Sequence, residues 1–115
     1  MNPIRRQSRT VQAPVAAFPV VGIGCSAGGL EALEQFLSHV PNRTGMAFVI
    51  VQHLDPSHDS ALPELLRRIT PMAVLEATED MAVEPDHVYV IPPNRDLSLR
   101  HGRLHLREPS APRGL

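Results

Sequence analysis

A serine and a histidine each stand where an apolar segment of the sequence ends. Ser26 lies in the glycine-flanked segment 24–28, directly after the apolar run 19–23. His53 follows closely after the next apolar run, 46–51. A serine hydroxyl activated by an imidazole is a nucleophile for acyl transfer. A tight turn from strand to helix would present such a serine beside the free amides of a helix N-terminus.

The segments around these two residues predict alternating strands and helices. The runs 19–23 and 46–51 are continuously apolar, which is typical of strands covered on both faces. Helical spacing between them places five apolar residues on one face: Leu30, Leu33, Phe36, Leu37 and Val40. Carboxyl ends of neighbouring parallel strands meet at one edge of a sheet, so we expect Ser26 and His53 to lie close together there.

The second half of the chain predicts one more helix, two more strands and a hairpin. The helix has Ser60 as its candidate N-cap and an inner face formed by Leu62, Leu65, Leu66 and Ile69. The strands are expected at 73–77 and 87–91. Two arms with leucine at alternate positions, 97–100 and 103–106, flank the two-residue turn His101-Gly102.

These elements predict an α/β fold with one folded unit. We expect a doubly wound, mostly parallel sheet with flanking helices and a C-terminal β-hairpin, incomplete at the C-terminus. The folded part is expected over residues 19–106, between a flexible lead (1–18) and a flexible tail (107–115). A parallel sheet of only four strands would leave an unpaired edge and an uncovered face, which favours self-association.

Composition narrows the class of protein. The chain has 115 residues, 43% of them hydrophobic, which fits one globular domain. The net charge of −1 gives no electrostatic footprint for nucleic acid. The single cysteine, Cys25, allows no internal disulfide, indicates a cytoplasmic location, and is expected to pack inward as a small apolar side chain. The run before Cys25 contains Gln12, Pro14 and Pro19, which argues against a signal peptide, and no run approaches the ~18 apolar residues of a membrane span.

Three motifs in register give the chain a resemblance to a known family. With Gly24-Cys25-Ser26-Ala27-Gly28-Gly29, Val51-Gln52-His53-Leu54 and Val88-Tyr89-Val90-Ile91-Pro92-Pro93, it resembles the catalytic domain of CheB-type chemotaxis protein-glutamate methylesterases, as found in CheB/CheR fusion proteins. The resemblance implies hydrolysis of glutamyl methyl esters, with glutamine deamidation as a side activity. It implies no cofactor.

The resemblance also implies site residues and partners. The nucleophile of the family carries over to Ser26 and its base to His53. The backbone amide of Ala27, at the head of the first helix, is the candidate oxyanion donor. The implied substrates are the methylated cytoplasmic helices of chemoreceptors, and the methyltransferase of the same pathway is a further implied partner.

Three departures from the family pattern weaken the expected activity. Ala27 stands where the family often has threonine, and only a short arginine-bearing lead precedes the domain where a receiver domain is common. The catalytic aspartate of the family belongs to a later Met-Gly-x-Asp-Gly segment that this sequence lacks. Asp55, two residues after His53, is better explained as a turn residue, so no third member of a triad is assigned.

Three other functions remain open from the residues alone. Gly22, Gly24 and Ala27 satisfy a dinucleotide-binding G-x-G-x-x-A fingerprint, although the second strand ends without the acidic residue that would hold a ribose. A metal site from His53, Asp55 and His58 has no established ligand spacing, and a solvated turn explains these residues better. A catalytically incompetent remnant or docking module of a signalling protein is the main alternative to the esterase.

Overall fold

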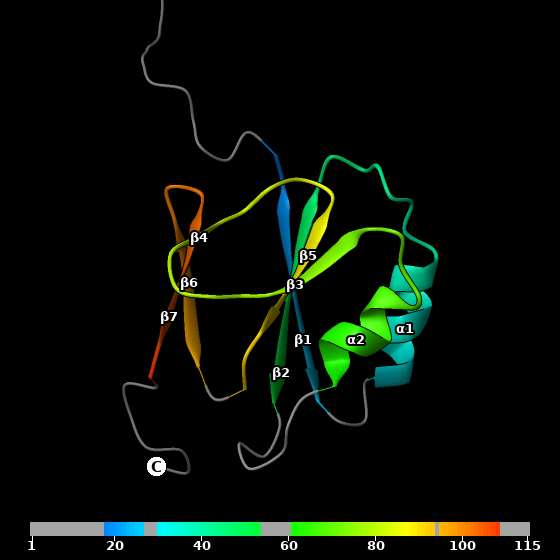
Figure 1. Ribbon diagram of the computed structural model, residues 1–115, viewed down its shortest axis with the longest axis horizontal. Helices are drawn as coiled ribbons and strands as arrows, with labels where there is room; N and C mark the ends of the chain where they lie inside the picture. The colour runs from blue at the N-terminus through cyan, green and yellow to red at the C-terminus, as the bar shows by residue number, and fades with distance from the viewer. Residues whose placement is uncertain (1–17, 27–29, 54–60, 94, 109–115) are drawn as a thin grey trace, which may run out of the picture.

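The computed structural model describes residues 18–26, 30–53, 61–93 and 95–108. Two helices and seven strands follow one another along the chain. They are β1 (Val20–Ser26), α1 (Leu30–Ser38), β2 (Ala47–His53), α2 (Leu62–Arg67), β3 (Ala73–Glu76), β4 (Met81–Ala82), β5 (His87–Ile91), β6 (Asp96–Arg100) and β7 (Arg103–Arg107). Figure 1 shows a central sheet with both helices on its right-hand side and a smaller sheet on its left.

The central sheet is parallel and has the strand order β1-β2-β5-β3, and the smaller sheet is antiparallel with the order β4-β7-β6. The expected α/β fold with a mostly parallel sheet and a C-terminal hairpin is confirmed. The four strands of the central sheet lie where the sequence predicted them, with one difference at the first. β1 continues through Gly24, Cys25 and Ser26, so these residues extend a strand instead of forming a turn.

The strand order explains why the helices and the small sheet lie on opposite faces. The connections β1-α1-β2 and β2-α2-β3 cross the sheet in the same direction, and right-handed crossovers then place both helices on the same face. The connection from β3 to β5 runs back in the reverse direction. It must therefore cross the other face, where β4 pairs with β7.

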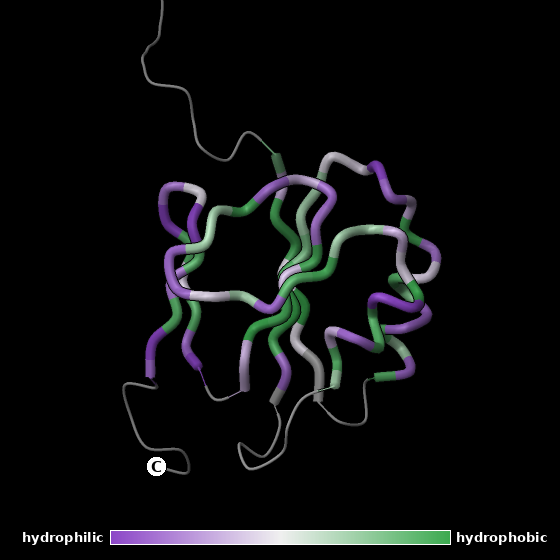
Figure 2. The backbone as a smooth tube through the Cα atoms, in the orientation of Figure 1, coloured by the Kyte–Doolittle hydropathy of each residue, from purple (hydrophilic) through white to green (hydrophobic). Residues whose placement is uncertain are grey.

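Two apolar clusters sit on the two faces of the central sheet. Alternate residues of β2 divide between them: Phe48 and Ile50 belong to the helix-side cluster, whereas Ala47 and Val49 belong to the hairpin-side cluster. Figure 2 shows the central strands as the most continuous hydrophobic part of the chain. The expectation of an uncovered face is wrong, because Leu104 of β7, fully buried, packs over the face opposite the helices.

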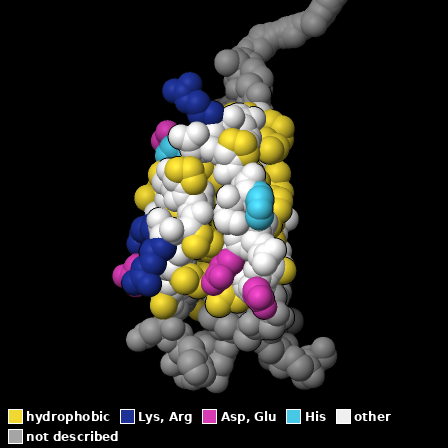
Figure 3. Space-filling view, turned by 90° about the vertical axis from the view of Figure 1, so that its right-hand side faces the viewer, with side chains coloured by type: hydrophobic (Ala, Val, Ile, Leu, Met, Phe, Trp, Pro, Cys, Tyr) yellow, Lys and Arg dark blue, Asp and Glu magenta, His cyan; other side chains and the backbone are white. Residues whose placement is uncertain are grey.

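The helices differ from their prediction mainly at their ends. Leu33 and Leu37 of α1 are buried, but Phe36 is 45% exposed, and its ring packs edge-on against Phe48 with centroids 6.1 Å apart. The helix side of the molecule shows apolar side chains among charged ones (Figure 3). The N-cap of α2 is Ala61, with no side-chain cap bond, so the assignment of the cap to Ser60 is wrong. Pro63 in the first turn removes a donor that would lack an intrahelical partner.

The hairpin turn follows the expected two-residue pattern. His101 and Gly102 have φ of 53° and 75°, and two successive positive φ values are the signature of a type I′ turn. This turn matches the right-handed twist of the flanking strands. Leu99 pairs with Leu104 one position beyond the pair next to the turn. Leu104 packs in the apolar cluster on the hairpin side of the central sheet.

Candidate active site

Ser26 and His53 are the last residues of two neighbouring parallel strands. The register of β1 and β2 pairs all seven residues of each strand, and the last pair is Ser26↔His53. Backbones of adjacent strands lie about 4.8 Å apart. The two positions are therefore adjacent at the carboxyl edge of the sheet, while the side chains of residues 25, 26 and 53 lie outside the described part of the structure.

The register is set at the opposite end of the strands. Ala47 N donates to Pro19 O at 3.1 Å, which begins the ladder between β1 and β2. Asp86 precedes β5 and accepts hydrogen bonds through Oδ1 from the amides of Thr44 and Gly45, both at 2.9 Å. These contacts align the start of β2 with the start of β5 along the strand direction.

The fold directs the chain to opposite faces after β2 and β5. β2 leads to α2 on the helix side, whereas β5 leads to β6 on the hairpin side (Figure 1). Ligands of open α/β sheets bind in the crevice outside the carboxyl ends of strands where the connections diverge in this way. His53 ends one of the two strands that flank this point, and Ile91 ends the other.

Two described residues next to this edge are buried. Gln52, next to His53, is only 7% exposed, and Ile91 is fully buried. Pro92 and Pro93 are half-buried where β5 leaves the sheet. The backbone at the carboxyl edge is thus supported by packed strands, which is what a site requires if it is to hold a reacting pair in place.

Several predicted site residues lie outside the described part of the structure. Ala27, the candidate oxyanion donor, is one of them, and Asp55 and His58 are others. Within the described ranges no group of three His, Cys, Asp or Glu residues is placed to hold a metal ion. Nor is any helix in those ranges long and apolar enough to cross a bilayer.

The structure argues against the dinucleotide-binding hypothesis. The first glycines of that fingerprint form the tight turn after a strand, where the backbone approaches a pyrophosphate. Gly22 and Gly24 instead lie within β1, paired with Val49 and Val51 of β2. Because both glycines are paired strand residues, they do not form the turn that dinucleotide binding requires.

These two glycines line an apolar groove that the sequence patterns did not predict. It has a volume of about 350 Å³ and lies between β1, β2 and the hairpin. Val49 and Val51 form its floor, and Leu97 and Leu99 form its hairpin side. The groove ends two residues before Ser26 and His53 along their strands.

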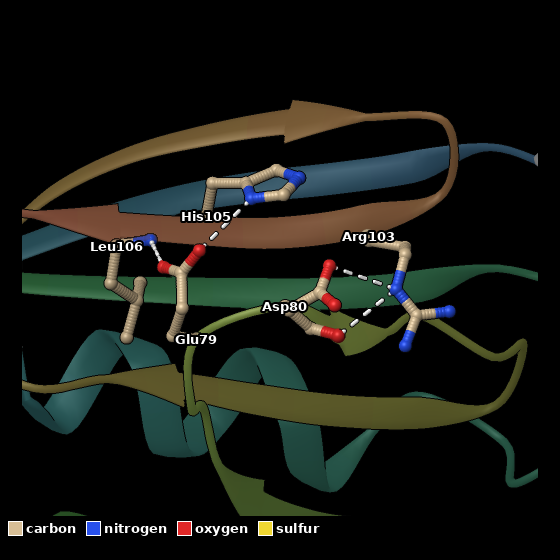
Figure 4. A network of polar contacts seen from close by, with 5 residues as sticks. All are labelled: Glu79, Asp80, Arg103, His105 and Leu106. Atoms are coloured by element: carbon tan, nitrogen blue, oxygen red, sulfur yellow. Dashed lines mark hydrogen bonds and ion pairs between the residues drawn. The ribbon is translucent and has the colours of Figure 1, made fainter.

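A polar network on the loop before β4 ties that loop to β7. Glu79 accepts a hydrogen bond from the amide of Leu106 at 2.7 Å, and its other oxygen lies 3.1 Å from His105 Nδ1 (Figure 4). The Leu106 amide, followed by His105, holds the pKa of the Glu79 carboxyl below its ordinary value. Arg103 Nε donates to Asp80 Oδ1 at 3.0 Å beside this pair. The network fixes the hairpin over the sheet and takes no part in the site.

Tyr89 on β5 anchors the same loop from inside the core. Its ring is 1% exposed, and its hydroxyl accepts a bond from Glu84 N at 2.8 Å and donates to Ala82 O at 3.3 Å. Burial raises the pKa of the Tyr89 hydroxyl. The contact explains how β4, only two residues long, keeps its place.

Comparison with known proteins identifies the relatives of this chain. The sequence pattern of the CheB methylesterase family matches residues 21–113, a range that includes both Ser26 and His53. A "Protein-glutamate methylesterase/protein-glutamine glutaminase 2" of Xanthomonas oryzae pv. oryzae is 42% identical over 80 residues, which cover 70% of this chain and 22% of that protein. A "Protein-glutamate methylesterase/protein-glutamine glutaminase 1" of Myxococcus xanthus is 34% identical over 92 residues, covering 78% of this chain and 27% of that protein.

A solved structure shares the fold. The CheB methylesterase catalytic domain of Thermotoga maritima matches with a TM-score of 0.71 at 26% identity. The match covers 85% of this chain and 53% of that domain. The chain thus spans about a quarter of the two full-length relatives and about half of the solved catalytic domain. Sequence pattern, relatives and fold agree, and the chain belongs to the CheB methylesterase family.

Proposed function

We propose that the chain carries the nucleophile and the general base of a protein-glutamate methylesterase, Ser26 and His53. The observation that carries this proposal is the backbone pairing Ser26↔His53 at the carboxyl edge of the sheet. A serine and its base must come within about 2.6–3.2 Å of each other through their side chains. Neighbouring positions on adjacent strands satisfy the backbone requirement for that contact.

The reaction is an acyl transfer in two steps. His53 accepts the hydroxyl proton of Ser26 while the oxygen attacks the carbonyl carbon of the methyl ester. The C–O bond to the methoxy group breaks, and methanol leaves with the proton from the imidazolium. Water then attacks the glutamyl-serine ester with His53 again as base, which releases the glutamate side chain and restores Ser26. The amide of Ala27 is the proposed donor to the oxyanion in both steps.

The orienting acid of the proposed site is not assigned to a residue of this chain. The family resemblance assigns this acid to an aspartate segment beyond the motifs found here. Loss of such an acid lowers turnover about 10⁴-fold in a serine triad, because the imidazole loses its correct tautomer and orientation. We therefore propose weak methylesterase activity for this chain alone and higher activity when the rest of a catalytic domain completes it.

The proposed substrates are glutamyl methyl esters on the cytoplasmic helices of chemoreceptors, with glutamine deamidation as a second reaction. The names of the relatives, methylesterase and glutaminase, support both reactions. Both replace a neutral side chain by a carboxylate at the same carbonyl carbon. The proposal places the chain in the cytoplasm, in the same pathway as the methyltransferase that forms the esters.

Methanol release from a methylated receptor peptide tests the proposal. Two proteins are compared, the chain itself and a fusion of the chain with the part of the Xanthomonas methylesterase that it does not match. We expect Ser26→Ala and His53→Gln to abolish release in the fusion, because each removes one partner of the proton transfer. Ser98→Ala on β6 and His39→Gln after α1 are matched controls that should retain the unsubstituted rate.

The same assay separates the esterase from a non-catalytic module. A serine-reactive fluorophosphonate followed by peptide mass analysis should mark Ser26 in both proteins. Undiminished methanol release by the fusion after Ser26→Ala would show that the nucleophile is elsewhere. No release by the folded fusion would favour the remnant or docking module.

A further inference from the structure

Arg95 lies at the edge of the molecule where the candidate active site is built. It directly precedes β6, and the first pair of the hairpin, Asp96↔Arg107, is the pair farthest from the hairpin turn. In Figure 1 this end of the hairpin lies at the same end of the molecule as the carboxyl ends of β1 and β2. Arg95 therefore shares that edge with Ser26 and His53, the last residues of those two strands.

The connection from β5 to β6 keeps Arg95 close to this edge. Ile91, the last residue of β5, is fully buried and pairs with Val51 of β2. Pro92 and Pro93 follow it and are half-buried, and each proline ring fixes its own φ at about −65°. The chain from Ile91 to Arg95 can span at most about 14 Å. Arg95 is thus held on a short, stiff connection that leaves the sheet next to β2.

The guanidinium of Arg95 already contacts one carboxylate. Its Nη1 lies 3.2 Å from Glu108 Oε2, and the two side chains are 38% and 75% exposed. An ion pair with one partner so exposed adds little to stability, so a competing carboxylate can replace Glu108 at low cost. A guanidinium carries five N–H donors, and a bidentate carboxylate takes two of them. Arg95 therefore has the chemistry to bind a carboxylate that a substrate brings.

Other arginines in the described ranges have different surroundings. Arg67 Nε donates to a carbonyl of β3, and Arg103 Nε donates to a carboxylate of the loop before β4, both at 3.0 Å. Arg107 stands opposite Asp96 in the hairpin ladder. Arg100 lies beside the hairpin turn, at the far end of β6 from the candidate site. The guanidinium at the start of β6 is better placed than these to meet a peptide at the reacting pair.

The proposed reaction determines which charge a substrate gains near a remaining ester. Each turnover replaces a neutral ester by a carboxylate. On a helix, residues three and four positions apart lie about 5–6 Å from each other on one face. A substrate helix with several glutamyl sites at this spacing therefore acquires carboxylates one turn away from esters that are still to be hydrolysed. A guanidinium at the same edge as Ser26 can hold such a carboxylate while the ester reaches the serine.

We propose that Arg95 is a specificity-determining residue that binds a substrate carboxylate one helical turn from the reacting ester, and that Glu108 competes with this carboxylate for the guanidinium. The inference rests on the proposed esterase function. Arg95 takes no part in bond making, which belongs to Ser26 and His53. Substrate helices that already carry glutamates are then preferred over helices whose neighbouring sites are glutamines.

Binding of two fluorescent peptides to the chain tests the inference without catalysis. Both peptides are helical and carry one glutamyl methyl ester, but one has glutamate and the other glutamine at the positions three and four residues away. We expect the glutamate peptide to bind the unsubstituted chain at least about tenfold more tightly, because it adds a charge-assisted bidentate contact. Arg95→Gln should remove this preference, and Arg95→Lys should keep only part of it, since an ammonium has no planar fork. Arg100→Gln, at the other end of β6, should leave the preference within about twofold.

Glu108→Gln gives a result that a folding defect cannot imitate. It removes the competing carboxylate, so the glutamate peptide should bind about two- to fivefold more tightly while the glutamine peptide is unaffected. Equal binding of the two peptides by the unsubstituted chain, or no binding of either, would overturn the inference. So would an undiminished preference in Arg95→Gln.

Kinetics of the fusion with the unmatched part of the Xanthomonas methylesterase separate this inference from the proposed function. For methanol release from the glutamate peptide, Arg95→Gln should raise KM at least about tenfold and leave kcat within about twofold, because the lost contact is made equally before and during the reaction. A fall in kcat with unchanged KM would contradict the assigned role. A folded fusion that shows the binding preference but releases no methanol would refute the esterase and leave Arg95 as a carboxylate-binding residue.

Discussion

Asp86 offers a quantitative test of how the sheet is held at the end opposite the candidate site. Its Oδ1 accepts two amide hydrogen bonds, from Thr44 and Gly45, and its own φ is +63°. Each lost bond costs about 1 kcal/mol at a partly exposed site. A residue with a Cβ but no local hydrogen bonds costs about 1 kcal/mol more at a positive φ. We therefore expect Asp86→Ala to lower the free energy of unfolding by about 3 kcal/mol.

Two further substitutions separate the bonds from the backbone conformation. Asp86→Gly loses both bonds but adopts the positive φ without strain, so we expect a loss of about 2 kcal/mol. Asp86→Asn keeps an acceptor oxygen and tolerates this conformation, so its loss should be about 1 kcal/mol or less. The expected order of stability is unsubstituted chain, Asn, Gly, Ala.

Urea denaturation followed by far-ultraviolet circular dichroism measures these differences, since the chain contains no tryptophan for fluorescence. Equal stability of the Ala and Gly variants would refute the contribution from positive φ. An Asn variant as unstable as the Ala variant would refute the contribution of the Oδ1 hydrogen bonds. Either result would require a different explanation of how Thr44 and Gly45 are held at the start of β2.

Four other substitutions test contacts of the hairpin and its loop. Tyr89→Phe removes the acceptor of the Glu84 amide and should lower the free energy of unfolding by about 1–2 kcal/mol in urea denaturation; no change would show that water replaces the hydroxyl. Glu79→Gln should destabilise the chain at about pH 6, and the difference should shrink toward about pH 3. The reason is that the folded-state pKa of Glu79 is lowered, so its contribution is present above the ordinary value of 4.5 and is lost as the pH falls. Gly102→Ala places a Cβ at a φ of 75° and should cost about 1 kcal/mol, whereas His101→Gly should not destabilise the turn.

The sequence predicted the parts of the fold that depend on short-range patterns. Continuous apolar runs located β2 and β5 because both strands are buried on both faces. The glycine of His101-Gly102 located the hairpin because the turn needs two positive φ values. The adjacency of Ser26 and His53 followed from the tendency of consecutive strands to be neighbours in a sheet, which β1 and β2 obey and β2 and β3 do not.

The remaining features depend on long-range pairing, which leaves little local trace. No residue pattern indicates that β5 inserts between β2 and β3. β4 has two residues and exists because the Tyr89 hydroxyl and β7 hold them. Ser60 has the chemistry of a cap, but the N-cap position lies one residue later, at Ala61, and the helix begins at Leu62. The groove depends on Gly22 and Gly24 facing the hairpin, a relation between distant segments.

The division of β2 between two apolar clusters has a consequence for the residues at its end. Sliding β2 along its neighbours by one position would turn Phe48, which is 1% exposed, from the helices toward the hairpin, and every other side chain of the strand with it. A shift of β2 by one residue would therefore disrupt both apolar clusters at once. The alignment of Ser26 with His53 therefore depends on apolar contacts along the whole of β2. Substitutions of buried residues in this strand should lower the proposed activity even though these residues lie away from the reacting pair.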